Sequence, residues 1–192
     1  MSEITFELRP VITRKESGRR GLVGPYGEVT LGHTRIKWPW SAAKPLELRL
    51  HGAQVPDATY TSLSTYRPTL KAPHLVLDGT PVDMSFKSCA FRKKDRVLRL
   101  SWLDRTYDYT VTGMKKGAVL RRPGVEITTE RRKNPAGKGL CSWGTATGEC
   151  DAIDLALAVL FEEVDTFELT TYAAMSEVFN KVTTPRRPEP MD

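Results

Sequence analysis

The side chains with the clearest chemical potential in this 192-residue sequence are clustered cations. Most clusters fall at expected strand ends or turns, and alternate turns of an antiparallel meander lie at the same end of the sheet. Some could therefore converge into one patch that holds phosphate by charge and forked hydrogen bonds. The alternative is a set of solvated turn residues. The candidate ligand-binding residues are Arg92, Lys93, Lys94, Lys115, Lys116, Arg121, Arg122, Arg131, Arg132 and Lys133, with Lys138 close by.

A second candidate interleaves aromatic and basic residues at Trp38-Pro39-Trp40, Tyr60, Tyr66 and Arg67. Exposed rings beside cations can stack on nucleic-acid bases or lie at a membrane surface. The alternative, which we favour, is that the tryptophans close one end of a barrel.

Catalytic patterns are weak in this sequence. Asp151 with Asp154 favours a helix cap, and Glu162 with Glu163 favours a polar exit where a helix leaves the core. The glycine-rich residues 21–32 lack the lysine and the following helix of a phosphate loop. We therefore expect no catalytic residue and no cofactor, since no nucleophile or carboxylate can be assigned to His33, His51 or His74.

The cysteines also argue against a disulfide-stabilised or metal-binding protein. Cys89, Cys141 and Cys150 are odd in number and widely spaced, which is not typical of a disulfide framework. No C-x-x-C pair is present, and the histidines are distant in sequence, so we expect no zinc site.

The net charge of +6 is unevenly distributed. Residues 1–148 hold 26 Lys and Arg against 13 Asp and Glu, whereas residues 149–192 hold 3 against 10. Such a field favours anionic partners without choosing among lipid, nucleic acid and protein. The N-terminus lacks the apolar core of a signal peptide, and no apolar run is long enough to span a bilayer, so we expect a cytoplasmic protein.

Period-two alternation dominates the first 146 residues and predicts short strands. The clearest pair is Leu98–Trp102 and Tyr107–Val111, which predicts a hairpin with its turn at Asp104-Arg105. Asp78-Gly79 predicts a second hairpin turn. Many short strands separated by Gly and Pro are typical of a sandwich or a barrel. Further strands are expected around Ile4–Leu8, Val29–Leu31, Leu46–Leu50, Val125–Ile127 and Leu140–Thr145.

The end of the chain predicts helices instead. Residues 152–161 are apolar on every face except at Asp154, which favours a helix buried on all sides. We expect this core helix over about 151–164 and an amphipathic surface helix over Thr171–Val182. Residues 1–182 are expected to form a single mainly β (α+β) domain, with a disordered tail at 183–192.

A basic, many-stranded region followed by one all-apolar helix resembles the tubby C-terminal-like fold of tubby domains, phospholipid scramblases and LURP-one-related proteins. The resemblance rests on the strands from Arg96 to Thr145 and on the segment from Cys150 to Glu163. It implies an antiparallel barrel that encloses the helix, and a phospholipid or membrane surface as partner. About thirty residues follow Glu163, whereas the family's core helix lies near the chain end.

These observations favour a non-catalytic binding module that engages an anionic phospholipid headgroup or membrane surface. Two alternatives remain open: a nucleic-acid-binding protein that uses the same cations, and an assembly protein whose acidic end meets a basic surface on a neighbouring copy.

Overall fold

The computed structural model describes residues 3–34, 43–87, 96–113, 116–135, 137–173 and 175. These ranges contain twelve β-strands, one α-helix and two short 3-10 helices. The strands are β1 (Ile4–Ile12), β2 (Glu16–Val23), β3 (Glu28–Thr34), β4 (Lys44–Gly52), β5 (Ala58–Ser64), β6 (His74–Leu77), β7 (Thr80–Ser85), β8 (Leu98–Trp102), β9 (Arg105–Gly113), β10 (Gly117–Arg122), β11 (Val125–Lys133) and β12 (Leu140–Gly148). The helices are η1 (Gly24–Tyr26), α1 (Ala152–Leu160) and η3 (Phe167–Leu169).

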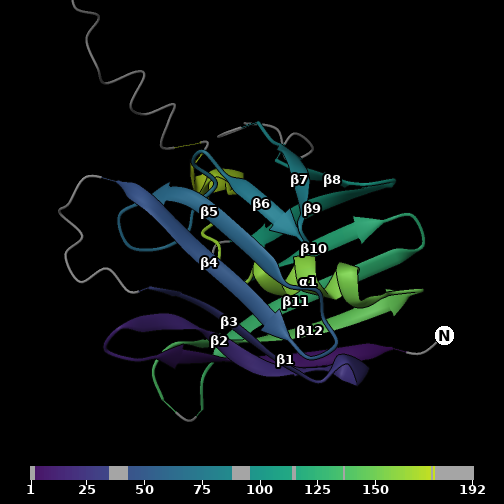
Figure 1. Ribbon diagram of the computed structural model, residues 1–192, viewed down its shortest axis with the longest axis horizontal. Coiled ribbons are helices and arrows are strands. Elements are labelled where there is room, and N and C mark those ends of the chain that lie inside the picture. The colour runs from purple at the N-terminus through teal and green to yellow at the C-terminus, as the bar shows by residue number, and fades with distance from the viewer. Residues whose placement is uncertain are drawn as a thin grey trace, which may run out of the picture.

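The twelve strands form one closed antiparallel barrel. Each strand pairs with the next one in the chain, and β1 also pairs with β12, which closes the sheet. Figure 1 shows the purple β1 beside the green β12 at this seam. Closure leaves the sheet without a free edge. The prediction of a mainly β protein is confirmed, and the architecture is a barrel rather than a sandwich.

Alternation along each strand fills the barrel with apolar side chains. In β4, Leu46, Leu48 and Leu50 are buried, whereas Glu47 and Arg49 are exposed. The same period-two pattern recurs in β8 and in the first half of β9. Because successive side chains point to opposite faces of a sheet, one row of each strand forms the core and the other meets solvent.

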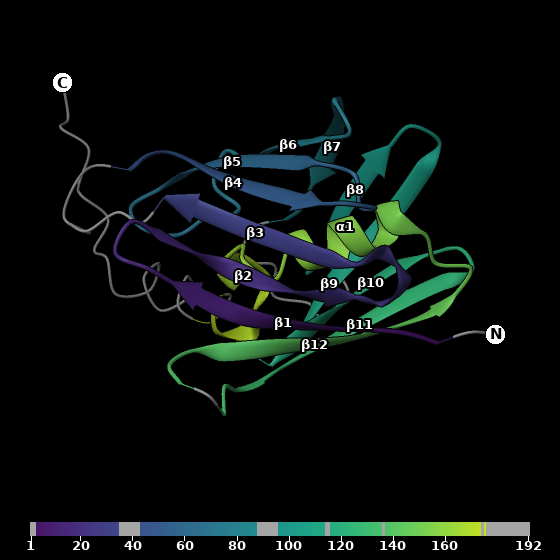
Figure 2. The same cartoon turned by 60° about the horizontal axis from the view of Figure 1, so that its bottom comes forward.

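The helix α1 lies inside the barrel, with strands around it in both views (Figures 1 and 2). Every residue from Asp154 to Leu160 is buried, as the all-round apolar pattern predicts. The helix ends earlier than expected, since Phe161 is its C-terminal cap. Phe161 packs between Tyr60 and Tyr109, whose ring centroids lie 6.1 and 4.9 Å from its own.

The first turn of α1 carries the expected cap. The Asp151 carboxylate accepts hydrogen bonds from the backbone N–H groups of Ile153 and Asp154. The Asp154 carboxylate accepts in return from the Asp151 N–H. This reciprocal capping box satisfies amide groups that have no partner within the helix.

The direction of α1 gives the barrel two distinct ends. We call the end where β12 leads into α1 the entry end, and the opposite end, toward which α1 runs, the exit end. Antiparallel strands place the β2–β3, β4–β5, β6–β7, β8–β9 and β10–β11 connections at the entry end. The other connections lie at the exit end, to the left in Figure 2.

The β8–β9 turn lies at Leu103-Asp104, one residue before the expected position, because Trp102 pairs with Arg105. Thr171–Ala173 are helical, but the rest of the expected surface helix and the expected tail at 183–192 fall almost wholly outside the described residues.

No helix in the described ranges has the length and apolar content of a membrane span.

Candidate anion-binding end of the barrel

The connections at the exit end are basic. Their described residues include eight Lys and Arg side chains and no Asp or Glu. The segment that follows α1 brings two half-buried carboxylates, Asp165 and Glu168, to the same end. The eight cationic residues are Arg14, Lys15, Arg67, Lys71, Lys87, Arg96, Lys116 and Lys138.

Lysines show this polarity most clearly. All seven lysines in the described ranges are exposed, and all seven lie in an exit-end connection or at the strand terminus next to one. No ion pair joins any of them to a described carboxylate. Exposed, unpaired ammonium groups on one end create a positive field that attracts anions. The seven are Lys15, Lys44, Lys71, Lys87, Lys116, Lys133 and Lys138.

The entry end has the opposite charge. Its connections carry Asp57, Asp78, Asp104, Glu149 and Asp151, and none of their residues is Lys or Arg. All the entry-end connections lie within the described residues, so this count covers that end completely. The barrel is therefore electrostatically polar along its axis.

The barrel wall, in contrast, is close to neutral because its exposed arginines are paired. Arg20 makes two hydrogen bonds of 2.7 Å with Glu28, and Arg121 lies 2.6 Å from Glu126. Such exposed pairs contribute little to stability, but they cancel the arginine charge locally. The other wall pairs are Arg9–Glu7, Arg49–Glu47, Arg99–Asp108 and Arg132–Glu130.

The predicted ligand-binding residues are divided among these regions. Lys116 and Lys133, with Lys138, lie together at the exit end. Arg121 and Arg132 lie on the wall and are paired with Glu126 and Glu130. Arg122 points into the barrel at the entry end, and Arg131 points into it near the exit end. Arg92, Lys93, Lys94 and Lys115 lie outside the described residues, although Lys87 and Arg96, on either side of 88–95, are at the exit end.

Below the exit-end surface lies a buried ion cluster that the sequence did not predict. Glu162 is fully buried, and its Oε2 lies 2.9 Å from Arg131 Nε. Its carboxylate also accepts hydrogen bonds from the hydroxyls of Thr129 and Ser142. The expectation that Glu162 and Glu163 mark a polar exit where the helix leaves the core is thus wrong, because both are buried. Burial of the carboxylate is possible because inward-facing strand residues supply its partners.

Glu163 is buried beside it and has its own partners. Its Oε2 lies 3.0 Å from Arg19 Nε and 3.9 Å from Arg67 Nη2, and its Oε1 lies 3.5 Å from His33 Nε2. Arg67 Nε also donates to the Glu163 backbone carbonyl. Burial opposes ionisation of this carboxyl, but His33 and the charges of Arg67 and Arg19 hold its pKa below the usual value.

These two carboxylates predict an acid-sensitive fold. Burial again acts against ionisation of Glu162, but Arg131, Ser142 and Thr129 hold its pKa below the unfolded value of 4.5. A carboxyl with a lowered folded-state pKa stabilises the fold above its unfolded pKa, and that contribution is lost as the pH falls through the folded value. Thermal midpoints measured from pH 7 to pH 3 should therefore stay high above about 4.5 and fall below it. A constant midpoint down to pH 3 would contradict this role for the buried pairs.

A second buried ion cluster anchors α1 at the entry end. Asp154 is fully buried, and Arg122 donates to both of its oxygens over 2.7 Å. Tyr107 adds a hydrogen bond of 3.1 Å. Arg105 lies 2.6 Å from the Asp151 carboxylate, which caps the same helix. Since Arg122 holds the helix, its guanidinium is engaged inside the molecule and adds little to the surface field.

The residues of the aromatic–basic candidate site also lie in different parts of the barrel. Tyr60 lies in the core, where its hydroxyl donates to the Thr69 carbonyl over 2.6 Å, so its ring cannot stack on an external ligand. Tyr66 is 57% exposed in the β5–β6 connection at the exit end. Arg67, next to it, is half-buried against Glu163. Trp38-Pro39-Trp40 falls outside the described residues.

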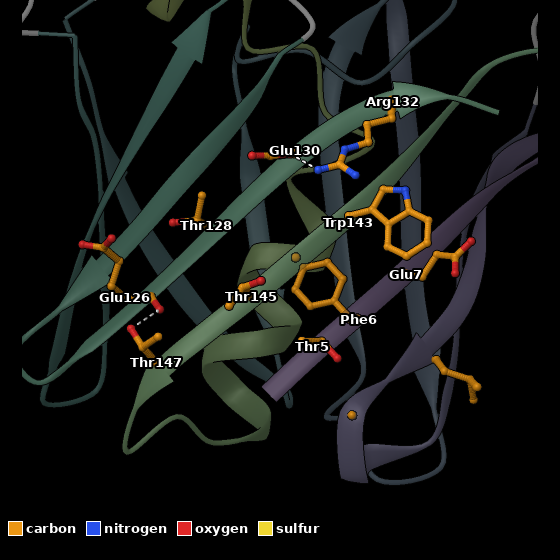
Figure 3. Close-up of a pocket in the computed structure, with 13 residues that line it drawn as sticks. Thr5, Phe6, Glu7, Glu126, Thr128, Glu130, Arg132, Trp143, Thr145 and Thr147 are labelled. Carbon is orange, nitrogen blue, oxygen red and sulfur yellow. Dashed lines mark hydrogen bonds and ion pairs between the residues drawn. The ribbon is translucent and has the colours of Figure 1, made fainter. Parts of the chain in front are cut away.

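A shallow hollow of about 740 Å³ lies on the wall near the seam, over β11, β12 and β1 (Figure 3). Trp143, 42% exposed, lies beside it with Glu7 and Arg132, and threonines cover much of its floor. Its charged lining includes Glu7, Glu126 and Glu130 against a single arginine, Arg132. An anionic ligand would be disfavoured there, so the hollow is a weaker candidate than the exit end.

Metal and thiol chemistry find little support in the described part of the chain. No three His, Cys, Asp or Glu side chains are grouped there as a metal ion requires. Cys141 is buried and Cys150 is half-buried, and neither forms a disulfide. Burial is the main reason that the pKa of Cys150 is raised to about 12, which keeps its thiol protonated and unreactive. Cys89 lies outside the described ranges.

The fold and the site define a closed twelve-stranded antiparallel barrel built around one helix, with a basic exit end. No protein-family model matches the sequence. No match was found among curated proteins or among solved structures.

Proposed function

We propose that the chain is a cytoplasmic, non-catalytic binding module that engages an anionic surface through the exit end of its barrel, with phospholipid headgroups as the partner. The observation that supports this most is the gathering of all seven described lysines, exposed and unpaired, at one end. Juxtamembrane lysines each contribute about 1 kcal/mol of attraction to an anionic leaflet. The acidic entry end would then face away from the membrane.

The proposal includes kinship with the tubby C-terminal-like fold. A closed antiparallel barrel around an apolar helix is compatible with that fold. The anion-binding surface proposed here is nevertheless defined only by this chain's own lysines.

Vesicle binding tests the proposal directly. The protein should co-float with vesicles that contain phosphatidylserine but not with pure phosphatidylcholine. Binding should weaken as salt rises, since charges are screened over about 8 Å at physiological ionic strength and about 3 Å at 1 M. The triple variant Lys71→Gln, Lys116→Gln and Lys138→Gln should lose about 100-fold in affinity, which corresponds to about 1 kcal/mol per lysine.

A matched variant controls for net charge. Arg9→Gln, Arg49→Gln and Arg99→Gln remove the same number of charges from the paired wall, and they should change vesicle affinity less than twofold. If both triple variants lose the same vesicle affinity, only net charge matters, and the exit end is not the binding surface. Salt-insensitive binding would also contradict it. Tighter binding to nucleic acid than to vesicles, with a steep salt slope, would favour the alternative ligand.

The opposite charges of the two ends favour one further candidate, a head-to-tail contact between copies. In that arrangement the basic exit end of one barrel meets the acidic entry end of the next. Sedimentation at low salt separates this function from membrane binding, because a monomer under those conditions excludes it.

A further inference from the structure

A small cavity opens beneath the exit-end surface, next to the buried ion cluster. Its volume is about 120 Å³, which corresponds to about four waters' share of liquid volume. Its wall is formed by β9, β10 and β11 on one side and by the segment after α1 on the other. The polar side chains that line it are those of Arg67, Tyr109, Arg131, Asp165, Thr166 and Thr170.

One of these groups lacks a partner. The Tyr109 hydroxyl is buried and has no hydrogen-bond partner among the described residues, although the Thr166 side chain lies close to it. Tyr109 is 2% exposed. Buried hydroxyls nearly always have a partner, because an unsatisfied one is costly. A ligand in the cavity would supply the missing acceptor.

The cavity lining itself carries two guanidinium groups, those of Arg67 and Arg131, and one carboxylate, that of Asp165. Arg67 and Arg131 are also held by the buried Glu163 and Glu162. Arg67 and Arg131 use Nε and Nη2 for their contacts with Glu163 and Glu162. An oxyanion in the cavity would accept hydrogen bonds from these two guanidinium groups.

Asp165 limits which anions the cavity can bind. Its carboxylate would repel a fully ionised anion such as sulfate. A phosphate group near its second pKa, by contrast, still carries an O–H that can donate to this carboxylate. The combination of two guanidinium groups, a tyrosine hydroxyl and a carboxylate matches an anion that both accepts and donates hydrogen bonds.

We propose that this cavity is a binding site for one protonated phosphate group, free or as a phosphate monoester. Its assignment to a lipid headgroup rests on the proposed membrane function, whereas its preference for phosphate does not. The site would then add chemical selectivity to the general attraction of the lysines.

Calorimetric titration with inorganic phosphate and with sulfate at pH 6 tests the site. Phosphate should bind, and sulfate should bind at least tenfold more weakly because it has no proton to donate. Tyr109→Phe should weaken phosphate binding at least tenfold. Tyr60→Phe, which removes a buried hydroxyl already bonded to Thr69, should change it less than twofold.

Asp165→Asn gives the sharpest discrimination, since an amide can donate to sulfate. This variant should bind sulfate more tightly than the wild type does and reduce the preference for phosphate. Absence of phosphate binding by the folded wild type would overturn the proposal. Equal affinity for the two anions, or equal effects of Tyr109→Phe and Tyr60→Phe, would overturn it as well.

Vesicles distinguish the source of the phosphate. If a headgroup occupies the cavity, phosphatidic acid, a monoester, should bind better than phosphatidylglycerol, a diester, and Tyr109→Phe should abolish the difference. Phosphate binding in solution without vesicle binding would leave the cavity assigned and remove the membrane function. If Tyr109→Phe leaves vesicle binding unchanged and phosphate does not bind in solution, the cavity assignment is wrong and the membrane function still stands.

Discussion

Glu162→Gln should lower the free energy of unfolding by about 3–5 kcal/mol, because it leaves the Arg131 guanidinium buried without its counter-charge. Glu162 is fully buried and the Arg131 side chain is 12% exposed, so water can replace little of the lost interaction. The glutamine is nearly isosteric, and the effect should therefore report charge rather than volume. Equilibrium urea unfolding of the two proteins measures the difference.

The neighbouring wall pair provides the control. Glu130 lies 2.8 Å from Arg132, but both side chains are more than half exposed. Glu130→Gln should change the unfolding free energy by less than about 1 kcal/mol. If both variants lose the same small amount, the buried cluster would not be the electrostatic anchor that its geometry indicates.

The second large effect concerns the hydrophobic end of α1. Phe161→Ala should cost about 3–5 kcal/mol, because it removes a fully buried ring that packs against Tyr60 and Tyr109 and leaves a cavity behind. The same urea experiment applies. Leu22, 65% exposed on the wall, is a suitable control, and Leu22→Ala should stay within about 0.5 kcal/mol of the wild type. A loss under 1 kcal/mol for Phe161→Ala would mean that the helix is not enclosed.

The sequence could predict the barrel because most of its strands obey a simple rule. Leu46, Leu48 and Leu50 are buried at alternate positions, and the apolar residues of α1 occupy every face of a helix. Such patterns depend only on the local period of hydrophobic residues. The Asp151–Asp154 cap followed from local chemistry in the same way.

The strands β2 and β5 were not predicted because several of their inward positions are not apolar. In β2 the pattern is broken by a buried arginine, Arg19, and by glycines, of which Gly21 would bring a Cβ within 1.8 Å of the Glu7 carbonyl oxygen. In β5 the buried row contains Ser62 and Ser64, whereas the more apolar Leu63 points outward. Polar inward residues and required glycines reverse the hydrophobic alternation that identifies a strand.

The buried ion clusters were missed for a related reason, although a signal for them exists. Arg131 falls two and four residues after Thr129 and Ile127, and Arg122 falls two residues after Leu120, so both share the face of buried residues. Parity along a strand therefore separates inward arginines from outward ones such as Arg121 and Arg132. The identity of their partners could not be predicted, because Asp154, Glu162 and Glu163 approach them only when the helix lies inside the closed sheet.

The seam between β1 and β12 has a consequence for how the chain folds during synthesis. β1 is the first strand of the barrel to be synthesised, and its second neighbour, β12, exists only after residues 140–148 have been made. Contacts so distant in sequence are associated with slow folding, on the order of milliseconds to seconds for β-rich domains. Until then one edge of β1 is open to pairing with other chains, which makes nascent or truncated forms prone to aggregate.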